Sequence, residues 1–185
     1  MGQLSKISSS SRREMLDWAL FVLLLIAIYS TLGIVRSVIR AINAAGYGYL
    51  IAWAMPAIAI PAVVFALFWL IFLKKVRTMK PYIALAGAGI AWGLTIALLS
   101  AAPVERVHLM EYGLVGILAY RAMGHRFSDF EQAALSGLIC LNAGFLDESI
   151  QGIVPGRYYD SNDVFVNFIA ASCGVILAAA WPRKS

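Results

Sequence analysis

The sequence carries little charge. Only 14% of its 185 residues are Asp, Glu, Lys or Arg, and 61% are hydrophobic, whereas roughly a quarter of the residues of a soluble domain are charged. This composition excludes an ordinary soluble domain and is typical of a membrane protein. The length allows one compact domain and no evident second one.

The sequence also lacks the short motifs of common enzymes. It contains no HExxH helix, no nucleophile elbow and no glycine-rich phosphate loop. Its two cysteines, Cys140 and Cys173, lie far apart inside apolar segments, so they form neither a metal-ligand spacing nor a disulfide framework. Both are expected to be small buried packing residues. The sequence therefore indicates no catalytic motif and no cofactor.

The distribution of the basic residues excludes a nucleic-acid partner. The net charge is +5, but the lysines and arginines cluster beside apolar segments and form no stripe with interleaved aromatic residues. That pattern fits the anionic lipids at the inner face of a membrane. Membrane lipids are therefore the expected partners, and the oligomeric state stays open.

Six apolar stretches have the length that a helix needs to cross a bilayer core of about 30 Å. They are residues 18–35, 50–73, 81–102, 107–123, 130–146 and 164–181. The sequence therefore predicts an all-α fold, a polytopic membrane bundle of about six transmembrane helices over residues 18–185. The polar, serine-rich residues 1–17 are predicted to form a short, partly disordered cytoplasmic tail.

Prolines, glycines and one amphipathic stretch predict local features of the spans. Residues 36–49 are mildly amphipathic and are predicted either to continue the first helix or to lie along the membrane interface. Pro56 and Pro61 fall inside the second span, where a kink is expected and not a break, because neighbouring helices can satisfy the freed carbonyls. Gly89 and Gly93 form a GxxxG face in the third span, which predicts close packing against another helix.

The basic residues also predict the orientation. Of the fifteen lysines and arginines, all but Arg36, Arg40, Arg106 and Arg157 fall on the side of the N-terminus. Loops rich in Lys and Arg stay in the cytoplasm. We therefore expect a multi-pass protein of the bacterial inner membrane with both termini cytoplasmic.

Polar side chains gather at the opposite, outward side. The stretch between residues 147 and 167 carries four carboxylates between two apolar spans, and the turn before the fourth span is polar as well. Three pairs stand three or four residues apart, so each pair shares a helix face. We expect them to converge in one polar pocket. The candidate ligand-binding residues are His108, Glu111, Tyr112, Glu148, Gln151, Arg157, Asp160, Asp163 and Asn167.

Simpler roles remain open for single members of this set. Asp163, or Ser161 or Asn162 before it, could cap the last helix. His125, on the inner loop, is expected to be solvated. Glu111 lies about one turn inside a span, where an unpaired carboxylate costs a few kcal/mol. Its side chain should therefore be paired, be neutralised or face a water-filled cavity. The stretch from residue 148 to 163 is long for a structureless loop and is predicted to fold over the site as an ordered lid.

The sequences HLMEYGLVGIL at residues 108–118 and DESIQGIVPGRYYDSNDVFVNFIAASCG at 147–174 resemble the VanZ-like family of bacterial integral membrane proteins. The likeness covers about residues 90–181. It rests on a histidine and a tyrosine opening one helix, then a Glu and Gln pair, a Pro-Gly-Arg turn and a later Asp-x-x-x-Asn pattern. Ala170 or Ala171 stands where the family often has glycine, with Gly174 beyond. The first two spans lie outside the likeness.

The resemblance implies a role at the cell envelope. The family is named for a protein associated with low-level resistance to teicoplanin, a glycopeptide antibiotic that acts outside the cell on a lipid-linked cell-wall precursor. A lipid-linked precursor or a glycopeptide is therefore a further expected partner. The resemblance implies no particular biochemical activity.

Three classes of function follow as hypotheses. In the first, the outer pocket binds a lipid-linked or antibiotic head group, and Arg157 holds a phosphate or carboxylate. In the second, the protein is an enzyme on a lipid-linked head group, with His108 or Glu148 as general base, Asp163 as an orienting carboxylate and Arg157 stabilising negative charge. A divalent ion held by Glu148, Asp160 and Asp163 is an open alternative. A transporter is disfavoured, because the ionisable residues lie at one face and not at the midplane.

Overall fold

The computed structural model describes residues 2–99, 105–155 and 157–182. These residues form six α-helices and one π-helical turn, and they contain no strand. The helices are α1 (Gly2–Ala44), α2 (Gly48–Phe68), α3 (Lys80–Leu98), α4 (Glu105–Met123), α5 (Asp129–Ile153) and α6 (Ser161–Ala180), and the π-helical turn η1 (Trp69–Leu73) follows α2. The predicted all-α bundle is confirmed.

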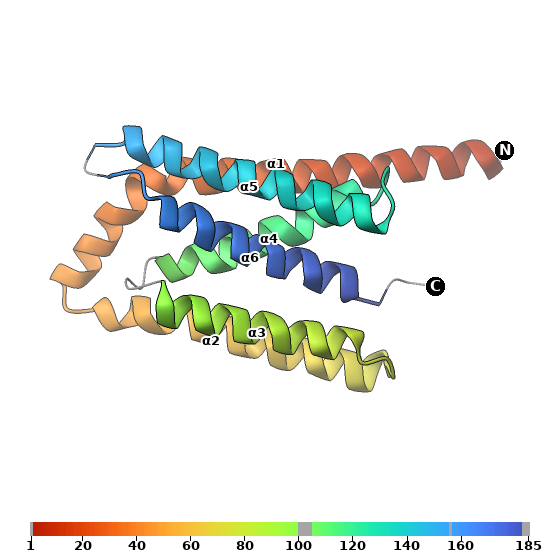
Figure 1. The fold of residues 1–185 in the computed structure, drawn as a ribbon, viewed down its shortest axis with the longest axis horizontal. Coiled ribbons are helices and arrows are strands. Elements are labelled where there is room, and N and C mark those ends of the chain that lie inside the picture. The colour runs from red at the N-terminus through yellow and green to blue at the C-terminus, as the bar shows by residue number, and fades with distance from the viewer. Residues whose placement is uncertain (1, 100–104, 156, 183–185) are drawn as a thin grey trace.

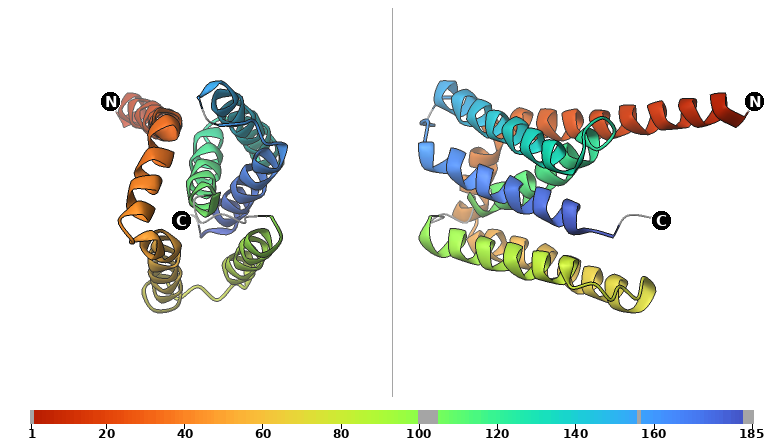
Figure 2. Two further views of the ribbon diagram at one scale, coloured as in Figure 1. Left: turned by 90° about the vertical axis from the view of Figure 1, so that its left-hand side faces the viewer. Right: turned by 45° about the vertical axis from the view of Figure 1, so that its right-hand side comes forward.

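Consecutive helices run in alternating directions (Figure 1). The chain ends and the connections after η1 and α4 lie at one end of the bundle, and the connections after α1 and α5 lie at the other. Helix α4 lies inside the bundle and packs against α1, α5 and α6 (Figure 2). The polar stretch between residues 147 and 167 is therefore at the end opposite the termini.

Five helical segments among the described residues are long and apolar enough to cross a membrane. They are Ser11–Val35, Gly48–Leu73, Lys80–Leu98, Asp129–Ile153 and Ser161–Ala180. These segments indicate a membrane protein. Helix α4, predicted as a further span, is not among them because it carries Glu105, Arg106, Glu111 and Arg121. Since α4 packs against α1, α5 and α6, most of its surface does not need to be as apolar as that of a lipid-facing helix.

The first helix differs from the prediction at both ends. Residues 2–17, expected to be a partly disordered tail, belong to α1. Asp17 joins this part of α1 to the end of α4 and the residues that follow it. Its carboxylate lies 2.6 Å from Arg121 Nη2 and 2.8 Å from His125 Nε2. Glu14 pairs with Arg126 in the same place. His125 is therefore paired with α1, and the prediction that it is solvated was wrong.

The C-terminal part of α1 continues the helix through Ala44, one of the two alternatives for residues 36–49. Figure 1 shows this part, in orange, turning away from the rest of α1 and crossing the end of the bundle. Gly46 follows with φ 82°, a left-handed conformation that favours glycine. Helix α2 then runs through Pro56 and Pro61 without a break, as predicted.

Helix α5 ends later, and α6 begins earlier, than predicted. Helix α5 continues to Ile153 and α6 begins at Ser161, so most of the polar stretch is helical. The predicted lid over residues 148–163 is therefore wrong, because the connection itself is short. The cap of α6 is Asp160, whose side chain accepts a hydrogen bond from the Asn162 backbone N–H at 2.8 Å, and none of the three predicted capping residues has this role.

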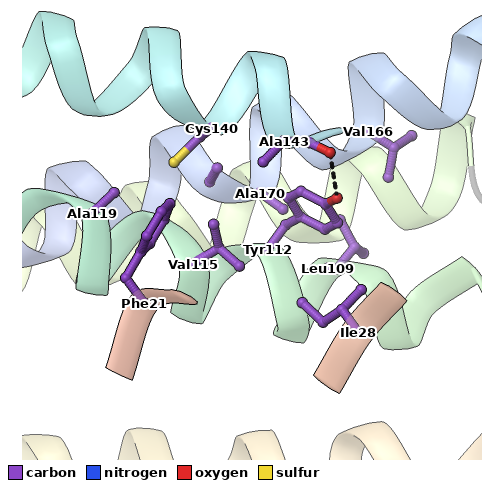
Figure 3. Close-up of a cluster of buried hydrophobic side chains, with 11 residues drawn as sticks. Phe21, Ile28, Leu109, Tyr112, Val115, Ala119, Cys140, Ala143, Val166 and Ala170 are labelled. Carbon is purple, nitrogen blue, oxygen red and sulfur yellow. Dashed lines mark hydrogen bonds between the residues drawn. The ribbon is translucent and has the colours of Figure 1, made fainter. Parts of the chain in front are cut away.

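The core is built around α4. Phe21 and Ile28 of α1 pack onto Leu109, Tyr112 and Val115 of α4, with α5 and α6 behind them (Figure 3). The two cysteines are free and buried, as expected.

Glycine sets the distance between α4 and α6. A Cβ added at Gly116 would lie 2.0 Å from the Ala171 carbonyl oxygen, and one added at Gly174 would lie 2.0 Å from that of Gly113. The predicted packing face at Gly89 and Gly93 is wrong within this chain, because a Cβ added at either residue would meet no other described atom within 4 Å.

Candidate functional site

Three helices bring polar atoms together beside the last turns of α5. The buried hydroxyl of Tyr112, on α4, lies 3.1 Å from both the Ala143 carbonyl oxygen and Asp147 Oδ2. Figure 3 shows the ring of Tyr112 standing between α4 and α5, with its hydroxyl at the Ala143 carbonyl. The hydroxyl of Tyr29, on α1, donates to the same carbonyl at 2.8 Å.

A histidine lies between two carboxylates at the start of α4. His108 Nδ1 is 3.1 Å from Glu111 Oε2 and 3.9 Å from Asp147 Oδ2. The side chain of Asp147 is fully buried, that of His108 is 12% exposed and that of Glu111 is 30% exposed. Glu111 is therefore paired, as expected, and it is the member of this group that reaches the surface.

The second carboxylate of α5 faces the start of α6. Glu148 is 1% exposed, and its Oε2 accepts a hydrogen bond from the Asp160 backbone N–H at 3.2 Å. Asp163, in the first turn of α6, lies within electrostatic range of both Glu148 and His108. Asp160, which caps α6, therefore also binds a side chain of α5.

Close packing brings the amide of α6 to the same place. A Cβ added at Gly144 would lie 3.2 Å from Cβ of Asn167 and 3.7 Å from the ring of Tyr112, so α4, α5 and α6 meet at this glycine. Asn167 is 1% exposed, and so is Gln151, one turn beyond Asp147 on α5. Both amides are thus enclosed by the helices that hold the carboxylates.

Several of these buried atoms make no hydrogen bond with the protein. Among the carboxylates and amides, these atoms are Asp147 Oδ1, Glu148 Oε1, Gln151 Nε2, Asn167 Nδ2 and Asn167 Oδ1, and the side chains of Asp147 and Gln151 lie close enough to interact. A buried polar atom left without a partner costs about 1–3 kcal/mol, and most buried polar groups in proteins do have one. The polar site, defined as His108, Glu111, Tyr112, Asp147, Glu148, Gln151, Asp163 and Asn167, therefore contains several buried donor and acceptor atoms without a hydrogen-bond partner in the protein.

Most of the residues expected from the sequence belong to this polar site, but two have other roles. Arg157 reaches α1, where its Nη1 donates to the Leu32 carbonyl oxygen at 3.2 Å. Asp160 turns its carboxylate to the α6 backbone and contributes only its own N–H to Glu148. Because Asp160 is used in this way, the divalent-ion alternative loses one of its three ligands. Among the described residues, no three His, Cys, Asp or Glu side chains are arranged to hold a metal ion.

Sequence reasoning missed Asp147 and Tyr29. Asp147 is central to the polar site, and its spacing of four from Gln151 was a usable signal, but the prediction ended the fifth helix at residue 146. Tyr29 gave no signal, since nothing in the apolar first span shows which face turns toward α5.

Comparisons with protein-family models, curated proteins and solved structures gave no match.

Proposed function

We propose that this protein is a VanZ-like integral membrane protein whose polar site binds the hydroxyl-rich head group of an envelope lipid, such as a lipid-linked sugar. One observation carries the proposal: five buried carboxylate and amide atoms at the ends of α5 and α6 make no hydrogen bond with the protein. Support for the VanZ-like assignment comes from His108, Tyr112 and Glu148, which the resemblance singles out and which lie in this site.

The donor and acceptor set suits a sugar. Asp147 Oδ1 and Glu148 Oε1 can accept hydrogen bonds from hydroxyl groups, and the amides of Gln151 and Asn167 can donate to hydroxyl oxygens. Inside a protein these bonds are stronger than in water. A phosphate does not suit the same place, because three carboxylates, those of Glu111, Asp147 and Glu148, would repel it.

Glu111 is the point of entry in this proposal. It is the most exposed member of the His108 group, and the site lies at the end of the bundle opposite the termini. With the orientation expected from the basic residues, this end faces outward, where lipid-linked cell-wall precursors and glycopeptide antibiotics meet. A role in teicoplanin resistance is the form of this function that the resemblance suggests.

Mass spectrometry of lipids that copurify with the protein tests the proposal. Glu148→Gln keeps the shape of the side chain but removes its charge and one acceptor oxygen. We expect the retained glycolipid to fall about tenfold or more, which corresponds to about 1.4 kcal/mol of binding free energy. Glu131→Gln, on the exposed start of α5, is the matched control and should retain the wild-type amount. Equal retention by Glu148→Gln and the wild type would contradict the proposal.

A second candidate is an enzyme that acts on the same head group. It is favoured by the position of His108 Nδ1 beside the carboxylates of Glu111 and Asp147, an arrangement suited to moving a proton. For an enzyme, His108→Gln should abolish conversion of an added lipid-linked sugar, measured by chromatography, and weaken its binding far less. For a binding protein, neither the wild type nor the variant should convert the lipid.

A further inference from the structure

A second pocket lies where the bend of α1 meets the connection between α5 and α6. Its volume is about 230 Å³. The connection passes α1 at the end of the bundle opposite the termini (Figure 1). The pocket is lined by Leu32, Gly33, Ser37, Arg40, Val154, Pro155 and Arg157.

The lining of this pocket is positively charged. It includes two arginines and no carboxylate. The hydrogen bond from Arg157 Nη1 to the Leu32 carbonyl oxygen, at 3.2 Å, holds one guanidinium against α1. Arg40 Nη2 lies 3.5 Å from the Ser37 hydroxyl, so a second guanidinium and a hydroxyl share the same wall.

We propose that this basic pocket binds the phosphate group of a membrane lipid. Arginine presents its N–H donors in a planar fork that matches the oxygens of phosphate, and the guanidinium keeps its charge at all physiological pH values. The apolar walls formed by Leu32, Val154 and Pro155 suit the glycerol and first acyl carbons beside a lipid phosphate.

The size of the pocket narrows the ligand further. Pockets for drug-sized ligands have volumes of roughly 300–1,000 Å³, and a hollow of about 230 Å³ is below that range. It suits a phosphoryl group and not a complete sugar phosphate. The inference is independent of the sugar-binding proposal, because it uses different residues and a charge of the opposite sign.

Native mass spectrometry of the full chain in detergent tests this inference. The probes are dioctanoyl phosphatidic acid, dioctanoylglycerol as the matched lipid without phosphate, and inorganic phosphate as a competitor. We expect phosphatidic acid to bind and dioctanoylglycerol not to bind. Competition by inorganic phosphate at similar concentrations would identify free phosphate as the ligand, and weak competition would identify the lipid; both results support a phosphate site.

Variants connect the binding to this pocket. Arg40 is exposed, so Arg40→Gln should fold normally, with an unchanged melting temperature, and weaken phosphatidic acid binding about tenfold or more. Arg40→Lys, which keeps the charge but loses the fork, should weaken it less. Arg77→Gln, an exposed arginine at the other end of the bundle, is the charge-matched control. Wild-type affinity in Arg40→Gln, or equal binding of dioctanoylglycerol and phosphatidic acid, would overturn the inference.

Discussion

Tyr112 shows how single atoms organise the polar site. Its ring is part of the apolar core, and its hydroxyl lies at hydrogen-bond distance from both a backbone carbonyl and the buried carboxylate of Asp147. A buried carboxylate is tolerated only with hydrogen bonds or a charge partner. Tyr112 and His108 together supply those contacts to Asp147.

Removing the hydroxyl should therefore destabilise the protein. Tyr112→Phe leaves the ring in place but takes a donor from Asp147, so the free energy of unfolding should fall by about 1–3 kcal/mol. Thermal denaturation of the purified protein in detergent measures the effect. Tyr158→Phe, at a side chain that is 85% exposed, is the control and should melt with the wild type. Identical melting of Tyr112→Phe would mean that the hydroxyl contributes nothing.

At the scale of elements, the contact between α4 and α6 decides the geometry of the site. Gly113 and Gly116 on α4 face Gly174 and Ala171 on α6 so closely that no Cβ would fit at Gly116 or Gly174. Small residues at helix crossings allow backbones to approach in membrane proteins. His108 and Tyr112 lie on this same helix α4, beside Asp147 of α5.

A methyl group at this crossing should push the helices apart. In Gly174→Ala the new Cβ would meet the Gly113 carbonyl oxygen, which belongs to a helix backbone and cannot turn away. Overpacking of this kind costs about 1–3 kcal/mol or more, so the melting temperature in detergent should fall clearly. Gly137→Ala on α5 meets no described atom and should be neutral or slightly stabilising, because alanine favours a helix. If both variants melt alike, the crossing is looser than described.

At the scale of the whole molecule, the bundle has two chemically different ends. One end carries both chain ends and the salt bridges of Asp17 with Arg121 and His125. The opposite end carries the polar site and the basic pocket. The two proposed ligand groups, a sugar and a phosphate, would therefore be met at the same membrane interface.

Labelling from outside the cell tests the orientation. We expect a membrane-impermeant thiol reagent to modify Ser161→Cys and not Thr78→Cys, because the two positions are exposed at opposite ends of the bundle and the basic residues predict a cytoplasmic location for the second. Both native cysteines are buried and should give no background. The reverse labelling pattern would place the polar site in the cytoplasm and exclude envelope precursors outside the cell as its ligands.

The class of fold and most members of the polar site could be predicted from the amino-acid sequence alone. Hydropathy is a local property, so the number of helices and their order could be read from it. Helical spacing placed His108 with Glu111 and Glu148 with Gln151, because residues three or four apart share a face whatever surrounds the helix.

Other features depend on how the helices pack against one another, which local sequence patterns do not contain. The rotation of each helix about its axis turned Tyr29 toward Ala143 and Gly174 toward α4, and it left Gly89 and Gly93 without a close contact within the described chain. Asp160 caps the start of α6 and also donates its backbone N–H to Glu148 of α5, a contact between two helices that no local pattern contains. Arg157 reaches the Leu32 carbonyl of α1, because folding brings the bend of α1 to the connection after α5.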